Sequence, residues 1–549
     1  MKFSKITLGL AACALALLTS CEKQLEEFNP SGLTADAVYS TPAGFESLVN
    51  AAYSYTRWWY GKEDGYSMSE MGTDLWLRGA GDVNPDLTDY ATLQSSSRAV
   101  ESMWGKLYTA INLCNAGINR IGTSGMTDAQ KTIREGELRF LRAFYYWHIV
   151  ESWGGVHFTT TETNGVQTTA NRTSVDEFYA QIIEDLNVAV ANLPNTTADV
   201  GRVTKPAAEA FLAKIYLTRG NNQQAATLAQ KVISGYSFQL LPSYASLWSM
   251  TNLENREIVW AVNYSKELTL NDRVDATLYP DGHPRGGNNG HVMWLMKYDD
   301  QPGMTRDIAN GRPFNRFMPS RYLLNLFDET RDSRYAASFR TVWTANTVVT
   351  GARNLAIGDT AILATKKVVS TAVRNAKKYR VFDVNDIYNA NGTAKNRLQY
   401  VCLRKFEDPT RPTIQEEQSA RDAYVIRLAD VYLMAAEANF KLGNLPQAVT
   451  QINTVRRRAA IPGRETQMEI ATSDLSLDFI LDERARELAG EQLRWFDLKR
   501  TGRLLSRVRA NNPEAGPSIQ DYHVVRPIPQ RQLDAILNGT EFTQNQGYR

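Results

Sequence analysis

Cysteine is scarce in this chain of 549 residues, which contains only four. Cys13 and Cys21 lie in or beside the apolar N-terminal segment, so that Cys114 and Cys402 are the two that remain. Two thiols this far apart exclude a disulfide framework and a cysteine-ligated zinc site. We expect both to be buried free thiols. The alternative is a single Cys114–Cys402 bridge, which would require an oxidising compartment.

Other signatures of catalysis and cofactor binding are also missing. No glycine-rich phosphate loop precedes a predicted helix, and no G-x-S-x-G nucleophile elbow is present. The five histidines lack metal-ligand spacing, although His283 and His291 share a loop. Asp82, Asp86 and Asp89 lack the glycine and the terminal acid of a calcium loop. We therefore predict no metal and no cofactor.

The chain has no excess of either charge. It contains 61 basic and 59 acidic side chains, and two of the basic ones, Lys2 and Lys5, lie in the first 20 residues. Removal of that segment leaves the two signs in balance. A balanced chain does not attract a phosphate backbone or an anionic membrane by its overall field, so nucleic acid and bulk membrane are poor candidate partners.

The chain has only one long apolar run, and it lies at the N-terminus. Lys2 and Lys5 precede an apolar stretch from Ile6 to Leu18, which is too short for a membrane span. The residues Leu18-Thr19-Ser20-Cys21 follow at the spacing of a lipoprotein cleavage site. We predict a signal peptide over 1–20 and acylation of Cys21. Acyl chains contribute about 0.8 kcal/mol per buried methylene, which suffices for anchoring without a basic patch. The alternative is an ordinary signal peptide with an accidental cysteine.

Most of the remaining chain shows helical periodicity. Thr41-Pro42 predicts a helix start, because threonine caps a helix and proline suits its first turn. Residues 137–151 are apolar on nearly every face, which predicts a helix buried inside the protein.

Two helical hairpins share one pattern. Gly220-Asn221 and Gly443-Asn444 each end one apolar helix, and a second helix containing small alanines follows. Glycine can close a helix in the left-handed conformation, and Pro446 suits the first turn of the next helix. The pattern is tetratricopeptide-like, although the two units are not in tandem along the sequence, so we expect them to be parts of a larger scaffold.

Long segments rich in Gly, Asn, Asp and Pro interrupt the helices at 61–100, 271–316 and 341–400. Loops of this length inside a compact body are usually functional or disordered. Because no linker divides the chain, we predict one mostly α-helical body with long loops and a few short strands. Its two parts are expected to be an N-terminal part, 21–235, and a C-terminal part, 236–549.

Several blocks, in order along the chain, resemble the SusD/RagB family of Bacteroidetes outer-membrane nutrient-binding lipoproteins. The closest lie in the C-terminal third, among them YVIRLADVYLMAAEA at 424–438 and RWFDLKR at 494–500, and an earlier matching block is ELRFLRAFYY at 137–146. Further matching blocks lie at 154–156, 202–208, 319–323, 332–334, 453–459, 480–488, 527–530 and 545–548. One block alone is weak evidence, whereas the ordered set is highly specific.

The resemblance implies a SusD-like scaffold and a function without catalysis. It implies a lipid-anchored protein on the outer face of the outer membrane, where it captures oligosaccharides for a SusC-like TonB-dependent transporter. Peptide cargo, as in RagB-like relatives, is the first alternative. A surface glycoside hydrolase is the second, and it would need two carboxylates facing one cleft. The alternating acids and bases between Glu483 and Lys499 instead favour ion pairs on a half-buried helix.

Family members hold ligands on loops over the scaffold, so candidate contacts are aromatic and hydrogen-bonding residues in the long loops. Indole and phenol rings stack on the C–H face of a sugar, and polar side chains bond its hydroxyls. Two regions fit, 58–86 and 279–298, and in the first at least one of Trp58 and Trp59 is expected in the core. The predicted contacts are Asp74, Trp76, Arg78, Tyr279, Asn288 and Trp294. For each of them, the alternative is a packed anchor inside its loop.

Overall fold

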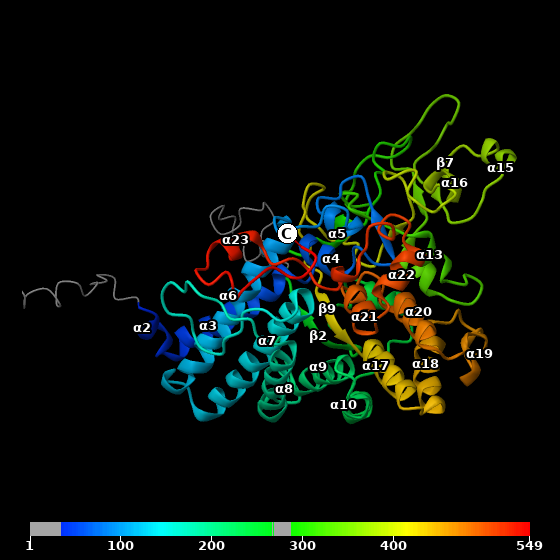
Figure 1. Cartoon of the computed structure of the whole chain (residues 1–549). Coiled ribbons are helices and arrows are strands. Elements are labelled where there is room, and N and C mark those ends of the chain that lie inside the picture. The colour runs from blue at the N-terminus through cyan, green and yellow to red at the C-terminus, as the bar shows by residue number, and fades with distance from the viewer. Residues whose placement is uncertain (1–33, 266, 268–286, 549) are drawn as a thin grey trace, which may run out of the picture.

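The computed structural model describes residues 34–265, 267 and 287–548. The predicted signal peptide, Cys21 and Tyr279 lie outside these residues. Figure 1 shows a long series of helices along one side of the molecule, with loops and short strands gathered on the other. The predicted mostly helical class is confirmed.

Seven helices form a continuous array in which each packs against the next. In spatial order they are α6 (Arg98–Arg120), α7 (Asp128–Trp153), α8 (Val175–Asn192), α9 (Lys205–Thr218), α10 (Asn222–Gly235), α17 (Leu428–Lys441) and α18 (Leu445–Ala459). The predicted hairpins are α9–α10 and α17–α18, and Gly220 and Gly443 each close a helix at φ 79°. Because α10 packs against α17, two hairpins that are distant in sequence are neighbours in space.

The remaining helices are shorter and mostly border the loops. They are α2 (Ala35–Tyr39), α3 (Pro42–Ser54), α4 (Glu63–Ser69), α5 (Pro85–Asp89), α12 (Gly290–Met293), α13 (Arg321–Asn325), α14 (Arg334–Ser338), α15 (Thr371–Asn375), α16 (Val384–Ile387), α19 (Glu465–Met468), α20 (Leu477–Leu488), α21 (Arg494–Arg500), α22 (Leu504–Asn511) and α23 (Gln530–Asp534). Short 3-10 turns, among them η1 (Tyr55–Trp58), connect several of them. Helix α3 begins as predicted, because the Thr41 side chain accepts a hydrogen bond from the Gly44 N–H at 3.2 Å.

Nine short strands form four small sheets within the described residues. The antiparallel pairs are β1 (Trp76–Arg78) with β3 (Phe317–Pro319), β2 (Ile258–Val262) with β9 (Ala423–Arg427), and β4 (Phe339–Arg340) with β8 (Cys402–Leu403). The fourth sheet has the order β5 (Val342–Thr344), β6 (Thr360–Ala364), β7 (Arg380–Phe382), and its β6–β7 pair is parallel. These strands confirm the loops with short strands that were predicted over 341–400.

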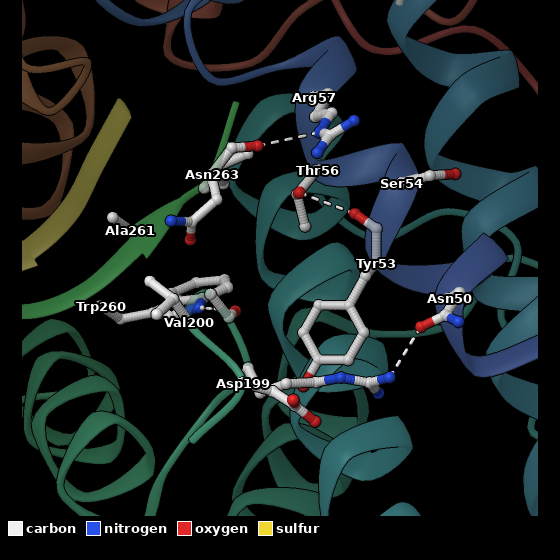
Figure 2. A pocket seen from close by; sticks show the side chains of 13 residues that line it. Asn50, Tyr53, Ser54, Thr56, Arg57, Asp199, Val200, Trp260, Ala261 and Asn263 are labelled. Atoms are coloured by element: carbon white, nitrogen blue, oxygen red, sulfur yellow. Dashed lines mark hydrogen bonds between the residues drawn. The ribbon is translucent and has the colours of Figure 1, made fainter. Parts of the chain in front are cut away.

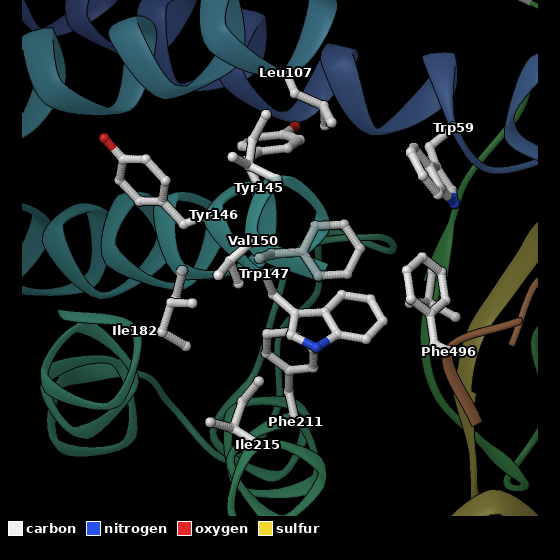
Figure 3. Packing of buried hydrophobic residues seen from close by; sticks show 14 of the residues in the cluster. Trp59, Leu107, Tyr145, Tyr146, Trp147, Val150, Ile182, Phe211, Ile215 and Phe496 are labelled. Carbon is white, nitrogen blue, oxygen red and sulfur yellow. The ribbon is translucent and has the colours of Figure 1, made fainter. Parts of the chain in front are cut away.

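The larger hydrophobic core lies within the helical array. As predicted, the apolar stretch at 137–151 belongs to one helix, α7, and all of its residues except Arg139 are buried. Figure 3 shows α7 aromatic rings between neighbouring helices, with the Trp147 ring 4.7 Å from the Phe496 ring. This core takes residues from both halves of the chain. The two halves therefore fold as one body, and the boundary at 235 stays a prediction.

A second core lies under the loops and contains Trp76, Trp294 and Trp343. Helix α20 joins the two, because its Leu481 belongs to the first core and its Ala485 to the second. Cys402 lies in the second core and Cys114 in the first, and both are free thiols as expected. Over the described part of the chain, no helix is long and apolar enough to cross a membrane.

Helix α20 also carries the centre of a buried ion network. Glu487 accepts hydrogen bonds from Arg334 at 3.0 Å and Arg427 at 2.8 Å, and it also pairs with Arg458. Burial alone would raise the pKa of Glu487, but the charges of Arg458, Arg427 and Arg334 outweigh it and lower the pKa to about 2. The alternating charges of this segment therefore form ion pairs, as predicted. The sequence indicated a half-buried helix, whereas most residues of α20 are buried.

The network joins elements that are distant in sequence. Arg334 lies on α14 and bonds Glu483 as well, at 2.8 Å, whereas Arg427 ends β9 and also bonds Glu257 at 3.0 Å. Glu257 immediately precedes β2, and Arg458 of α18 bonds it at 2.6 Å. One buried cluster thus fixes the helical array, the β2–β9 pair and the loop side relative to one another.

Removal of one charge from this cluster should be costly. Glu487→Gln keeps the side-chain volume but leaves three buried guanidinium groups without their shared partner. We expect a loss of about 3–5 kcal/mol in the free energy of unfolding, measured by urea denaturation. The control is Glu469→Gln on the exposed Arg457–Glu469 pair, which should cost at most about 1 kcal/mol. Equal effects of the two substitutions would contradict the structural role of the network.

Candidate functional site

A groove follows strand β2 on the side away from β9 (Figure 2). Three adjoining depressions of about 350, 340 and 390 Å³ share lining residues and together form it. The groove is lined by Asn50, Tyr53 and Arg57 of α3 and η1, by 199–202, by 250–256 and 258–263, and by Asp422. We call this surface the β2 groove.

The β2 groove combines aromatic rings with polar side chains. The Tyr53 ring is half-buried, and the Arg202 guanidinium lies 5.0 Å from its centre and donates to Asn50 Oδ1 at 2.7 Å. The Trp260 indole N–H donates to the Gly201 carbonyl at 3.1 Å. The Trp260 ring is buried in the larger core, so the half-buried Tyr53 is what offers the groove a partly exposed ring, beside donors and acceptors for hydroxyl groups.

The far end of the groove is held by Asn263 and Asp422. Asn263 Nδ2 donates to Asp422 at 3.1 Å, and the backbone N–H of Tyr264 donates to the same carboxylate at 2.9 Å. The Asn263 carbonyl accepts from Arg57 Nε at 3.0 Å. Burial raises the pKa of Asp422 to about 6, and this effect exceeds the lowering by the Tyr264 N–H bond. The carboxyl group therefore titrates close to neutral pH.

Gly201 sits tightly against this end of the groove. It adopts φ 89°, and a β-carbon placed on it would lie 2.3 Å from Asn263 Oδ1. That oxygen is buried and has no hydrogen-bond partner among the described residues. Only glycine fits this position, because both the positive φ and the close approach exclude a side chain.

The structure places two of the predicted contacts, Asp74 and Trp76, in the interior. Asp74 is fully buried and accepts hydrogen bonds from Arg494 at 2.8 and 2.6 Å and from Arg507 at 3.0 Å. Trp76 is also fully buried, and its indole N–H donates to Glu70 at 2.7 Å. Neither presents a face to solvent in this structure.

Asn288 and Trp294, the two described candidates of the second predicted region, are also buried. The Trp294 ring lies 4.3 Å from the Trp76 ring within the second core. Asn288 donates through Nδ2 to the Arg421 carbonyl at 2.8 Å. These contacts, like those of Asp74 and Trp76, favour the alternative of a packed loop anchor. Ligand contact by these four residues stays a prediction, and so does contact by Tyr279, which lies outside the described residues.

Arg78 is the one described candidate that reaches the surface. It ends β1 and is half-buried beside the loop at 312–316. In that loop Phe314 is partly exposed between two guanidinium groups, Arg312 at 5.2 Å and Arg316 at 5.0 Å from its ring centre. This loop surface around Arg78 is a second place where a ring face and cationic donors occur together.

Sequence reasoning missed the β2 groove. Arg57 directly precedes Trp58, where the first predicted region began, and no prediction was made for the segment that contains Trp260. The groove is assembled from four segments that are far apart along the chain, so no local pattern marks it. In the part of the chain that the structure describes, no group of three or more His, Cys, Asp or Glu side chains is arranged to hold a metal ion.

Comparison with known families gives two matches. The model described as the SusD family matches residues 256–548, and one described as starch-binding associating with outer membrane matches residues 63–217. The first match covers more than half of the chain. The chain therefore belongs to the SusD family, which confirms the resemblance read from its sequence.

Individual relatives agree along nearly the whole chain. The SusD-like protein P25 of Formosa agariphila is 27% identical, covering 96% of this chain and 97% of that protein. The starch-binding protein SusD of Bacteroides thetaiotaomicron is 25% identical over 88% and 85% of the two chains. The solved surface glycan-binding protein A of Bacteroides thetaiotaomicron, in complex with laminarihexaose, shares the fold at TM-score 0.69 and 21% identity, covering 92% and 99%.

The burial of Trp76 gives a test of its role. Trp76→Ala removes a fully buried indole and its contact with Trp294, so we expect a loss of about 3–5 kcal/mol in the free energy of unfolding. Trp76→Phe, which retains a ring, should cost less. Chemical denaturation measures both variants. Unchanged stability of Trp76→Ala together with lost glycan affinity would instead place this side chain on a ligand surface.

Proposed function

We propose that this protein is a cell-surface glycan-binding lipoprotein that captures oligosaccharides and delivers them to a SusC-like TonB-dependent transporter in the outer membrane. The observation that carries the proposal is the β2 groove, an open surface in which the partly exposed ring of Tyr53 lies among amide, guanidinium and carboxylate groups. Membership of the SusD family supports it, and so do relatives named for starch and laminarin binding.

The groove suits binding without catalysis. Its best-placed carboxylate, Asp422, is engaged by Asn263 and by the backbone of Tyr264, so it acts as a positioning group. Relatives are named as binding proteins, which agrees with this role. An open, wet surface binds weakly at each site, roughly micromolar to millimolar, and gains when several sites hold one polymer.

The proposed tether is the acylated Cys21, on the outer face of the outer membrane. The L-T-S-C sequence at 18–21 supports the acylation. The family description that associates these proteins with the outer membrane supports the location. In this arrangement the groove residues Asn50, Arg57 and Asn263 contact the glycan, and Arg78 and Tyr279 contribute from the loops.

A peptide is the second candidate ligand, because strand β2 has an edge that could pair with it. Within the described residues β2 is hydrogen-bonded only to β9, and the backbone from Ile258 to Asn263 lines the groove. An extended peptide could add itself to such an edge by main-chain hydrogen bonds. Stacking on Tyr53 contributes little in that mode, whereas it is central to glycan binding.

Calorimetric titration of the mature chain with glycan and peptide panels tests the proposal. We expect binding to a glycan, which is recovered uncleaved, and a roughly tenfold loss of affinity for Arg57→Ala, because one charged hydrogen-bond donor is removed. Arg464→Ala, an exposed position elsewhere, is the matched control. Binding to peptides alone would favour the second candidate, and cleavage of the bound glycan would refute a purely binding role.

Arg78→Ala in the same titration separates the two surfaces. A loss of affinity in Arg78→Ala with none in Arg57→Ala would move the site from the β2 groove to the loops. Co-purification of the acylated protein with the TonB-dependent barrel encoded beside its gene tests the delivery role. If the two proteins do not associate, the proposed delivery to the transporter is refuted, whereas the proposed glycan capture is unaffected.

Glycan affinity should depend on pH through Asp422. Its pKa of about 6 means that the carboxyl group becomes charged between pH 5 and 7. A carboxylate accepts stronger hydrogen bonds from the Asn263 amide and the Tyr264 N–H than a neutral acid does, so it holds Asn263 more firmly in its binding position and affinity should rise several-fold over this interval. Stability should change in the opposite sense, because the raised pKa favours the folded state at low pH and this contribution is lost as pH rises through about 6.

Asp422→Asn is the control for this pH dependence. Titrations of both proteins at pH 5 and pH 7 provide the measurement, with the rise expected only in the wild type. An identical rise in the variant would assign the pH dependence to another group.

A further inference from the structure

One corner of the molecule carries a local excess of basic residues. Residues 341–380 form the β5–β6–β7 sheet and helix α15, which lie at an outer corner remote from α2 (Figure 1). This segment contains seven basic residues and one acidic residue, Asp359, in a chain whose total charge is nearly balanced. We call it the basic corner.

Four of these charges have no acidic partner. Arg353 donates to the Lys378 carbonyl at 2.9 Å, and burial, followed by the charge of Arg380, lowers the pKa of Arg353. Within the described residues no carboxylate oxygen lies within 4.0 Å of the charged nitrogens of Arg353, Lys377, Lys378 or Arg380. A cluster of like charges costs free energy, so an anionic partner would stabilise it.

The other three basic residues show the contrast. Lys366 and Lys367 face Glu329 at 3.3 and 3.5 Å. Arg374 bonds Asp383 at 2.7 Å and Asp386 at 2.6 Å. Neighbouring acidic residues therefore neutralise these three cations, whereas the four cations of the cluster around Arg353 have no such partner.

Large aliphatic side chains are exposed on the same segment. Val348, Ile357 and Val368 are 64, 67 and 69% exposed, and Val342 and Val373 are 45 and 48% exposed. Exposure of aliphatic side chains to water is unfavourable, so their concentration on one outer segment indicates a contact surface. None of the five is aromatic. Of the two aromatic residues in the segment, Trp343 is buried and Tyr379 is half-buried with Lys377 5.8 Å from its ring centre, so the exposed apolar surface is mainly aliphatic and suits sugar stacking poorly.

We propose that the basic corner docks onto an anionic lipid surface, with the four unpaired cations at lipid phosphates and the aliphatic side chains at the acyl boundary. Cationic side chains interspersed with aliphatic ones are the chemistry of interfacial membrane binding. The neutrality of the whole chain does not oppose this contact, because charges act over about one Debye length, roughly 8 to 10 Å. The contact is independent of the glycan-binding role and adds to any tether at the N-terminal end.

Vesicle co-sedimentation tests the proposal on the chain from residue 22, which has no acylation site. We expect binding to phosphatidylcholine vesicles that contain an anionic phospholipid, little binding to phosphatidylcholine alone, and weaker binding as salt is raised. The variant Arg353→Gln, Lys377→Gln, Lys378→Gln, Arg380→Gln should lose roughly a hundredfold or more in partitioning. This estimate takes about 1 kcal/mol for each charge and tenfold for each 1.4 kcal/mol.

A matched control removes the same number of charges elsewhere, at Lys131, Arg464, Arg509 and Arg531, and should bind as the wild type does. Circular dichroism confirms that each variant is folded. Val348→Ser with Ile357→Ser and Val368→Ser should remove the part of the binding that resists salt. Absence of wild-type binding, or equal loss in the variant and the control, would overturn the proposal. Retention of polygalacturonate without vesicle binding would also overturn it, because the occupant would then be a glycan.

Discussion

The buried ion network around α20 is the interaction on which the arrangement of this protein depends. Glu483 and Glu487 lie fully buried between two hydrophobic cores, and each is shared by arginines from different elements. Taking charges out of water is costly, so the network stabilises the protein only while every member is paired. Such a cluster specifies one arrangement of helices, strands and loops, because a shifted element would leave a charge unpaired inside the protein.

The network reaches the β2 groove through the strands it holds. Arg427 lies opposite Ile258 in the β2–β9 register, and Glu257, which precedes β2, bonds the same arginine. The other end of β2 is fixed by Asp422 and Arg57. Strand β2 is therefore held rigidly at both ends while its outer edge stays open. A rigid, open surface suits repeated capture and release of polymers better than a closed pocket does, because little conformational entropy is lost on binding.

The sequence predicted local structure well because local structure has local causes. The Thr41 cap, the left-handed turns at Gly220 and Gly443 and the buried helix at 137–151 each depend on residues within one or two turns. The packing of α10 against α17 has no such signal, since about 190 residues separate the two helices. The ordered family blocks supplied the fold that periodicity alone could not.

The candidate site was harder to predict for two reasons. In loops, apolar residues have no period that distinguishes an exposed ring from a buried one, and Trp76 and Trp294 pack against each other instead of facing solvent. The β2 groove comes from four separate segments, so only their arrangement in space reveals it. The net charge of the whole chain was also a poor guide to its surface, because a balanced total conceals the excess of basic residues at 341–380.

The central claim is that a rigid scaffold presents the β2 groove to a glycan that it does not cleave. Hydrogen–deuterium exchange with and without a glycan that binds tests it most directly. We expect ligand-dependent protection of the backbone at 199–202 and 258–264, unchanged slow exchange in α7 and α17, and recovery of the glycan at its original length. Protection confined to 78–94 and 312–316 with none along β2, or a shortened glycan, would contradict the account.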